Sequence, residues 1–475
     1  MIVKKHIIAS VLLWGVLAGP LPAFAGAPDE ESYLTEGIKA IPEEDIREVV
    51  RALSESSDRL YDVLRQAYET NPTLQAANAE LRAVEESLPQ AAAGYKPTIT
   101  ANADVLYTDT QNEGNSSSSQ DGDNLSKEGS VSLKQPLYRG GRTASALRGA
   151  RNSILAQSAA VDSVRQKLML DVATAYMDVL RDRALLNLSE NNKALISRQL
   201  EATKDRFEVG ELTRTDVSQA QAREAGAVSD IISAKAKMRS SVAVYEQIVG
   251  SVPDQTLLYP DIRFSLPETL EEALSEAAQK NPSVLSAEYK NAAAEDDVDT
   301  VFGELLPEVS LTGGLSKSYD PQPGTLDETR ESTVGVSASI PLYQAGSVRS
   351  RVRQAKQTAN QRFIQIMEAR RRVRAETISS WENLAAAKAE IISRRAQVEA
   401  SAMAQEGVRY ESDFGERTIL DALDADQEYL DAQVGLVSAR RNEIVARFSL
   451  AAVLGRLTPE ILEFSSKKEN EEENR

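Results

Sequence analysis

The sequence predicts an α+β protein in which long antiparallel helical hairpins and pairs of alternating strands are each built twice. Three observations predict this class. The 475-residue chain repeats itself at an offset of 210 and then 205 residues, and two long stretches lack proline and carry apolar residues every seven positions. In addition, four short segments alternate between apolar and polar residues, which is typical of strands with two different faces.

The two ends of the chain are set apart from this pattern. Lys4 and Lys5 precede an apolar run at 7–18 and the small-residue site Ala23-Phe24-Ala25, which is the layout of a secretory signal peptide over residues 1–25. We expect cleavage near Ala25. Residues 26–57 form an N-terminal extension before the first repeat, and 459–475 (ending SSKKENEEENR) read as an acidic disordered tail.

Composition excludes several kinds of chemistry. The chain has no cysteine, and its one histidine, His6, lies in the signal peptide. The exported protein therefore lacks thiolates, disulfides, histidine bases and Cys/His metal sites, and no cofactor or metal is predicted. A net charge of −18 argues against binding nucleic acid through a basic surface. No later segment is long and apolar enough for a transmembrane helix.

The internal duplication defines the domain organisation. Asn71-Pro72 matches Asn281-Pro282, and QPLYRGG at 135–141 matches IPLYQAG at 340–346. The change of offset places one length difference between Pro97 and Pro136. We predict a first repeat over 58–250, a linker over 251–267 and a second repeat over 268–458. The other matched pairs are Pro97/Pro307, Gly210/Gly415, Thr213/Thr418 and Asp216/Asp421.

Each repeat contains one helical hairpin. The stretches 142–209 and 347–414 contain no proline, and residues such as Val161, Leu168 and Val373 belong to seams with a period of seven. At 1.5 Å per residue, each helix would extend roughly 100 Å. Gly210 and Gly415 interrupt the seams and are predicted hairpin turns, after which helices return to Gly250 and Gly455.

Each repeat also contains two strands, at about 98–109 and 127–138 and at about 308–319 and 331–342. Their alternation is clear in TITANADVLY, where Ile99, Val105 and Tyr107 oppose Thr100 and Asp104. We expect strand–helix bends at Pro97, Pro136, Pro307 and Pro341. The alternation fits either a soluble core or strands between lipid and water. Four strands cannot close a membrane barrel, whereas two chains would give eight strands and three would give twelve.

These features together resemble the TolC-like outer-membrane efflux and type I secretion channels, over roughly residues 58–458. The most specific segments are the two Asn-Pro pairs, QPLY/IPLY, Gly-x-x-Thr-x-x-Asp at 210–216 and GERTILDALDA at 415–425. The resemblance implies a homotrimer with four transmembrane strands per chain, a twelve-stranded barrel in outer-membrane lipid and an α-barrel crossing the periplasm. It also implies a periplasmic adaptor (membrane fusion) protein and an inner-membrane pump of the ABC or RND type as partners.

The resemblance further assigns roles at the periplasmic entrance. Two family aspartates that project into the pore match Asp421 and Asp424. The family arginine that ties neighbouring hairpins together matches Arg417, and its partners map to Thr215 and Asp216. The family latch also uses a tyrosine; that position is Ser412 here, with Tyr410 two residues earlier.

The acidic segment itself allows several interpretations. At 100° per residue, Asp421, Asp424, Glu428 and Asp431 form one stripe, and Asp426 lies outside it. The stripe is either a solvated helix face or a pore lining in which Glu428 and Asp431 line the tunnel. A calcium loop is excluded because Tyr429 and Gly435 occupy the positions that require Gly and Glu. A glycosidase pair lacks an aromatic platform, so no enzyme is predicted.

As a pore lining, the stripe has physical consequences. Rings of carboxylates attract cations, and crowded carboxylates raise one another's pKa, so we predict cation selectivity and block by multivalent cations. The alternative from another class is a periplasmic or adhesive coiled-coil structural protein without a channel. That alternative shares the export signal and the heptads but leaves the four duplicated strands unexplained.

Overall fold

The computed structural model describes residues 60–110, 122–254, 257–260, 262, 264–322 and 326–458. The chain divides into two units, Met1–Glu55 and Ser56–Arg475, and all described residues belong to the second. The predicted signal peptide (1–25), the N-terminal extension (26–57) and the acidic tail (459–475) therefore lie outside the described residues. The following description concerns the second unit alone.

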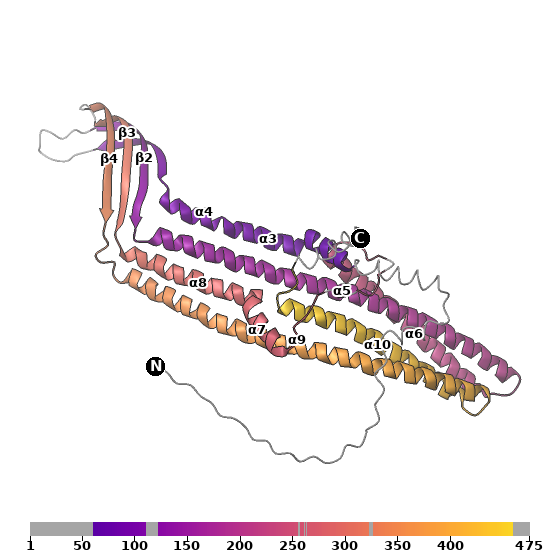
Figure 1. The fold of residues 1–475 in the computed structure, drawn as a ribbon. Helices are drawn as coiled ribbons and strands as arrows, with labels where there is room; N and C mark the ends of the chain where they lie inside the picture. Colours follow the sequence, from indigo (N-terminus) through magenta and orange to yellow (C-terminus); the bar gives the residue numbers. More distant parts are fainter. Residues whose placement is uncertain are drawn as a thin grey trace, which may run out of the picture. The chain divides into compact units, whose positions relative to one another are not determined.

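Four strands form one antiparallel sheet at one end of this unit (Figure 1). They are β1 (Thr98–Thr110), β2 (Gly122–Arg139), β3 (Glu308–Gln322) and β4 (Leu326–Ser339), in the order β1-β2-β3-β4. The central β2–β3 pair joins the two repeats, because each strand comes from a different one. This sheet confirms the predicted four strands in two hairpins.

The strand bounds differ from the sequence expectation at the loop ends. β2 begins at Gly122 instead of about 127, and β4 begins at Leu326 instead of about 331. Most of these added residues are polar or charged, and each segment contains a single leucine, so alternation does not reveal them. They nevertheless continue the antiparallel ladder: Asp123 pairs with Asp109 and Glu328 with Tyr319. Backbone pairing in a hairpin extends beyond the apolar part of its strands.

The four prolines fall into two kinds. Pro97 and Pro307 directly precede β1 and β3, as expected of bends. Pro136 instead lies inside β2, next to a register shift, and β2 ends three residues later at Arg139. Proline cannot donate to the ladder and is tolerated at such bulges. Pro341 follows the end of β4 at Ser339, so β4 stops before the predicted 342.

The helices of the two repeats match in order and length. The first repeat has a helix whose described part is 60–70, then α3 (Pro72–Glu85), α4 (Ser87–Ala92), η1 (Ala93–Tyr95), α5 (Arg142–Glu208) and α6 (Arg214–Val249). The second repeat has α7 (Leu270–Lys280), α8 (Pro282–Phe302), η2 (Gly303–Leu305), α9 (Ser347–Asp413) and α10 (Ile419–Val453). The predicted long hairpins are confirmed: α5 and α9 contain 67 residues each.

The helices form a layer that continues from the sheet (Figure 1). α3 and α4 pack on α5, α5 packs on α8, and α8 packs on α9, while α6 and α10 return along α5 and α9. The order of elements across the layer thus follows the order of strands in the sheet. None of the helices in the described part of the chain combines the length and apolar character that a membrane crossing requires.

The repeated Asn-Pro pairs fix where each returning helix ends. The Asn71 side chain caps α3 by accepting from Thr73 N at 2.9 Å, and its Nδ2 donates to Ile248 O at 2.8 Å. Asn281 does the same for α8, donating to Val453 O at 2.7 Å. One side chain therefore caps a helix start and satisfies a carbonyl at the end of another helix.

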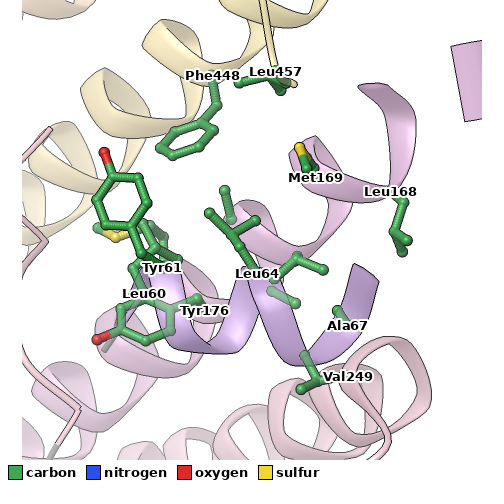
Figure 2. Packing of buried hydrophobic residues seen from close by; sticks show 14 of the residues in the cluster. Leu60, Tyr61, Leu64, Ala67, Leu168, Met169, Tyr176, Val249, Phe448 and Leu457 are labelled. Carbon is green, nitrogen blue, oxygen red and sulfur yellow. The ribbon is translucent and has the colours of Figure 1, made fainter. Parts of the chain in front are cut away.

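The main apolar core lies at the level of these junctions. Figure 2 shows residues of the 60–70 helix converging with residues of α5, α6 and α10. Tyr176 and Phe448 are among its fully buried side chains, and Tyr176 Oη donates to Leu258 O at 2.8 Å. A second, smaller cluster joins α7, α8, α9 and α10 around Val284 and Leu450. The sheet and the hairpin tips project from these cores.

Candidate functional site: the hairpin tips

The two hairpin turns are built by the same capping chemistry. α5 ends in a turn where Gly210 has φ +84°, and α9 ends in a turn where Gly415 has φ +79°. Such left-handed positions favour glycine, which has no Cβ to clash. The amide N–H of each glycine donates to a helix carbonyl three residues earlier, at 3.0 and 3.1 Å. Gly210 and Gly415 thus stop the long helices and reverse the chain.

The returning helices begin with capping boxes. Thr213 Oγ1 accepts from Asp216 N, while the Asp216 carboxylate accepts from Thr213 N at 2.8 Å. Thr418 and Asp421 repeat this arrangement, with Thr418 N donating to Asp421 Oδ2 at 3.0 Å. The motif Gly-x-x-Thr-x-x-Asp is therefore a turn-and-cap signature. Sequence reasoning missed this role of Asp216 and Asp421, although Thr-x-x-Asp before a helix could have revealed it.

The caps also set the electrostatics of each tip within one chain. The predicted mutual rise in pKa concerns six carboxylates crowded around the opening of a trimer, and it stays a prediction. Within the chain, the hydrogen bonds from the Thr418 side chain and backbone hold the pKa of Asp421 below its usual range, and Thr213 lowers the pKa of Asp216 likewise. Hydrogen bonds to the charged form favour ionisation. Both aspartates are therefore anionic near neutral pH.

Asp424 carries an ion pair that the sequence did not predict. Its carboxylate on α10 pairs with Arg223 of α6, which connects the second hairpin to the first. The two residues are 201 positions apart, and no local periodicity joins them. Both side chains remain partly exposed. Asp424 thus lies one helical turn beyond Asp421, as predicted, but the chain supplies a positive charge beside it.

The other acids of the stripe differ in burial. Asp426 is buried and accepts from Gln405 Nε2 and pairs with Arg409, both at 2.8 Å, which joins α10 to α9. Its place outside the exposed stripe agrees with the helical-wheel angle. Glu428 and Asp431 are exposed, and Asp431 accepts from Gln427 at 2.9 Å. Within the described ranges, no three acidic, His or Cys side chains gather closely enough to hold a metal ion.

Arg417 pairs within its own hairpin. Its Nε lies 3.0 Å from Glu411 Oε2, so the pair spans the turn between α9 and α10. Among the described residues of one chain, no bond joins Arg417 to Thr215 or Asp216, which lie at the tip of the first hairpin. The predicted latch between neighbouring hairpins stays a prediction.

Aromatic and apolar side chains are exposed beside these charges. The rings of Tyr410 and Phe414 contact each other in a tilted arrangement with centroids 4.7 Å apart, and both side chains are about two-thirds exposed (67% and 69%). Ser412, which takes the place of the latch tyrosine, is buried. Phe207 and Val209 are exposed at the other tip. Exposed apolar groups gathered at both tips are typical of a surface that contacts another protein.

The fold and the hairpin tips define a class of protein with duplicated helical hairpins. A sheet with one apolar and one polar face lies at one end of the hairpins, and turns with acidic side chains lie at the other. The family model described as "Outer membrane efflux protein" matches residues 63–251 and 273–456. The chain belongs to this family, whose members are outer-membrane channels. The two matched segments coincide with the two structural repeats.

Comparisons with individual outer-membrane proteins support the same family assignment. The chain is 31% identical to the outer membrane efflux protein BepC of Brucella suis over 86% of this chain and 87% of BepC. It is 30% identical to the outer membrane protein TolC of Vibrio cholerae over 85% and 92%. The solved structure of the outer membrane protein VceC from Vibrio cholerae matches with a TM-score of 0.71 at 19% identity, over 84% and 96%. The chain is thus an outer-membrane efflux channel protein.

Proposed function

We propose that three copies of this chain form a passive exit duct of a tripartite efflux pump or type I secretion system. The observation that carries the proposal is the sheet. Its register places Ile99, Leu133 and Val334 in one row of one face, and Thr98, Lys134 and Thr312 in a row of the other. Ile99 and Val334 are 68% and 86% exposed, so no part of the described chain covers the apolar face. Lipid on one side and water on the other satisfy such a sheet.

The two open edges of the sheet support closure by further copies. β1 and β4 each pair on one side only, and unpaired strand edges are not stable in hydrocarbon. The helical layer ends in the same way, with α3 and α4 at the β1 side and α9 at the β4 side. Contacts between two different edges are heterologous, and they produce rings when the rotation closes. Three copies give twelve strands, enough to leave a pore, whereas two give eight and a filled interior.

The side chains at these helical edges are complementary. α9 exposes Phe363 and Ile364, and its exposed basic residues include Arg371 and Arg374. α3 and the residue that follows it expose Glu80, Glu85 and Glu86. The α9 edge thus combines apolar side chains with basic ones, and the α3 edge is acidic. This complementarity supports packing of α9 against α3 of the next copy.

The hairpin tips form the entrance in this proposal. Six carboxylates from Asp421 and Asp424 surround the opening, Glu428 and Asp431 line the tunnel behind it, and Arg417 latches neighbouring hairpins near Thr215 and Asp216. The exposed apolar tips contact a periplasmic adaptor protein, which connects the duct to an inner-membrane ABC or RND-type pump. The signal peptide is removed near Ala25 during export to the outer membrane.

A cross-linking experiment tests the trimer directly, because the chain contains no cysteine. Thr100→Cys on β1 and Thr333→Cys on β4 would be introduced together and joined by a short flexible cross-linker. The proposal predicts a ladder of covalent products that stops at three chains, and conducting channels in planar bilayers. Each single-cysteine variant is the control and should yield no product larger than two chains. A double-cysteine ladder that stops at two chains would contradict the trimer.

A further inference from the structure

The apolar face of the sheet changes character near the loops. The paired residues Ala103, Gly129, Lys317 and Arg330 form one row of this face, and Val105, Lys127, Tyr319 and Glu328 form the next row outward. The rows nearer the helices hold Ile99, Leu133, Val131 and Leu315. Partners in an antiparallel register share a face, so the basic side chains lie on the same side as the apolar band.

The position of these rows along the strand matches a membrane boundary. From Val309 to Tyr319, β3 counts about eleven residues, which is the length of a strand that crosses the hydrocarbon region. Exposed tyrosines lie at both limits: Tyr138 near the helices, and Tyr107 and Tyr319 near the loops. Aromatic side chains at both interfaces are typical of outer-membrane strands. The basic rows therefore coincide with the outer interface.

These two rows carry a surplus of positive charge. Lys127, Lys317 and Arg330 contribute three cations, and Glu328 is the only acid. Glu328 lies 3.2 Å from Lys317 Nζ and also pairs with Arg330, so one carboxylate is shared by two cations. Lys127 is exposed and forms no ion pair with another described residue. The next acids on this face, Asp109 and Asp123, lie two rows farther out.

We propose that Lys127, Lys317 and Arg330 bind the phosphate groups of an anionic lipid in the outer leaflet of the membrane. The apolar rows below contact the acyl chains, and Lys317, which lies 4.5 Å over the Tyr319 ring, is held at the boundary. Basic clusters beside an apolar membrane surface recognise phosphorylated head groups. In the trimer the three clusters form a belt. The inference rests on the outer-membrane orientation given under the proposed function.

The test measures lipid binding to the purified channel. Wild type and the variants Lys127→Gln and Lys127→Gln/Lys317→Gln/Arg330→Gln are titrated in mild detergent with bisphosphorylated lipid A and with the same glycolipid after dephosphorylation, and native mass spectrometry counts the bound lipid. Each lost cation should weaken binding of the phosphorylated lipid about fivefold. The dephosphorylated lipid should bind all three proteins equally. Inorganic phosphate at millimolar concentration should not displace the lipid, because its acyl chains contribute to binding.

A matched control separates this site from general electrostatics. Lys134→Gln removes the same charge from the same strand, but on the opposite face, and should leave lipid binding unchanged. Equal binding of phosphorylated lipid by wild type and Lys127→Gln would overturn the inference, as would equal losses in Lys127→Gln and Lys134→Gln. Conductance of the wild-type channel in planar bilayers is recorded in parallel. A conducting channel without lipid preference rejects this inference alone, whereas a chain that forms no channel rejects the proposed function as well.

Discussion

The two hairpin tips have the same backbone and different charges. Gly210, Thr213 and Asp216 build the first turn, and Gly415, Thr418 and Asp421 build the second. Each turn is also spanned by an ion pair, but its polarity is reversed: Arg206 on the helix end meets Glu211 in the first, and Glu411 on the helix end meets Arg417 in the second. The duplication preserved the capping scaffold while the charges diverged.

The acidic stripe shows the same divergence more strongly. At the offset of 205, Asp421 corresponds to Asp216, but Asp424, Glu428 and Asp431 correspond to Gln219, Arg223 and Gly226. The shared aspartate is explained by capping, whereas the three later acids are not needed for the turn. Asp216 and Asp421 therefore build the turns, whereas the three later acids give the second tip its negative charge.

The largest difference in stability is expected at Asp426. Asp426→Ala would leave Arg409 and Gln405 without their buried acceptor and should reduce the free energy of unfolding by about 2–3 kcal/mol. The corresponding change in the first hairpin, Gln221→Ala, removes an exposed side chain and should cost less than about 0.5 kcal/mol. Thermal or urea unfolding followed by circular dichroism measures both. Equal losses would contradict this difference between the hairpins.

Substitutions of Arg223 and of Asp424, which form the ion pair between α6 and α10, should shift ion selectivity in opposite directions. Arg223→Gln frees the charge of Asp424 and should raise the cation-to-anion permeability ratio about fivefold, as expected for a unit charge at close range in water. Asp424→Asn should lower the ratio. The reversal potential in planar bilayers under a salt gradient measures it.

Two controls show whether Arg223 acts through Asp424. The double variant Arg223→Gln/Asp424→Asn should behave as Asp424→Asn alone. Lys235→Gln removes a cation from the same helix, where Lys235 pairs with Glu190 of α5, and should not alter selectivity. If Arg223→Gln and Asp424→Asn shift selectivity in the same direction, the pair only ties the hairpins together.

The caps should contribute equally in the two hairpins. Thr213→Ala and Thr418→Ala should each cost about 1 kcal/mol of stability, measured by unfolding at neutral pH. The pKa values of Asp216 and Asp421 are lower in the folded chain, so their contribution is complete above the unfolded value of about 3.9. It is lost as the pH falls through the lowered folded-state pKa values. A cost at one tip only would contradict the shared capping role.

The smallest free-energy change is expected at the turn-spanning ion pairs, which are exposed and contribute about 0–1 kcal/mol each. If Arg417 also latches the next hairpin, Arg417→Ala should increase single-channel conductance, because the substitution removes the latch from all three chains of the trimer. Arg206→Ala breaks the equivalent pair at the first tip and should leave the conductance unchanged. Equal effects of the two variants would assign Arg417 a local role only.

The sequence predicted the elements whose signal is periodic. Heptads without proline located α5 and α9, and alternation located the apolar part of each strand. The mostly polar ends of β2 and β4 carry no such signal. Pro136 lies inside β2 because a bulge accommodates it. The ion pair of Arg223 and Asp424 depends on how two hairpins pack, so only the fold reveals it. The motif Thr-x-x-Asp before a helix predicts the capping role of Asp421. This role was missed because the neighbouring acids suggested a pore lining instead.

The most direct test of the central claim is single-channel recording of the purified protein, with and without a multivalent cation such as La³⁺ on the side of the hairpin tips. The account predicts a conducting, cation-selective channel that the cation blocks. In Asp421→Asn/Asp424→Asn, selectivity and block should both be reduced. Asp216→Asn alters the matching cap but lies outside the acidic stripe, so it should retain the cation selectivity and the block. A wild-type protein that does not conduct, or a double variant with unchanged selectivity and block, would contradict the account.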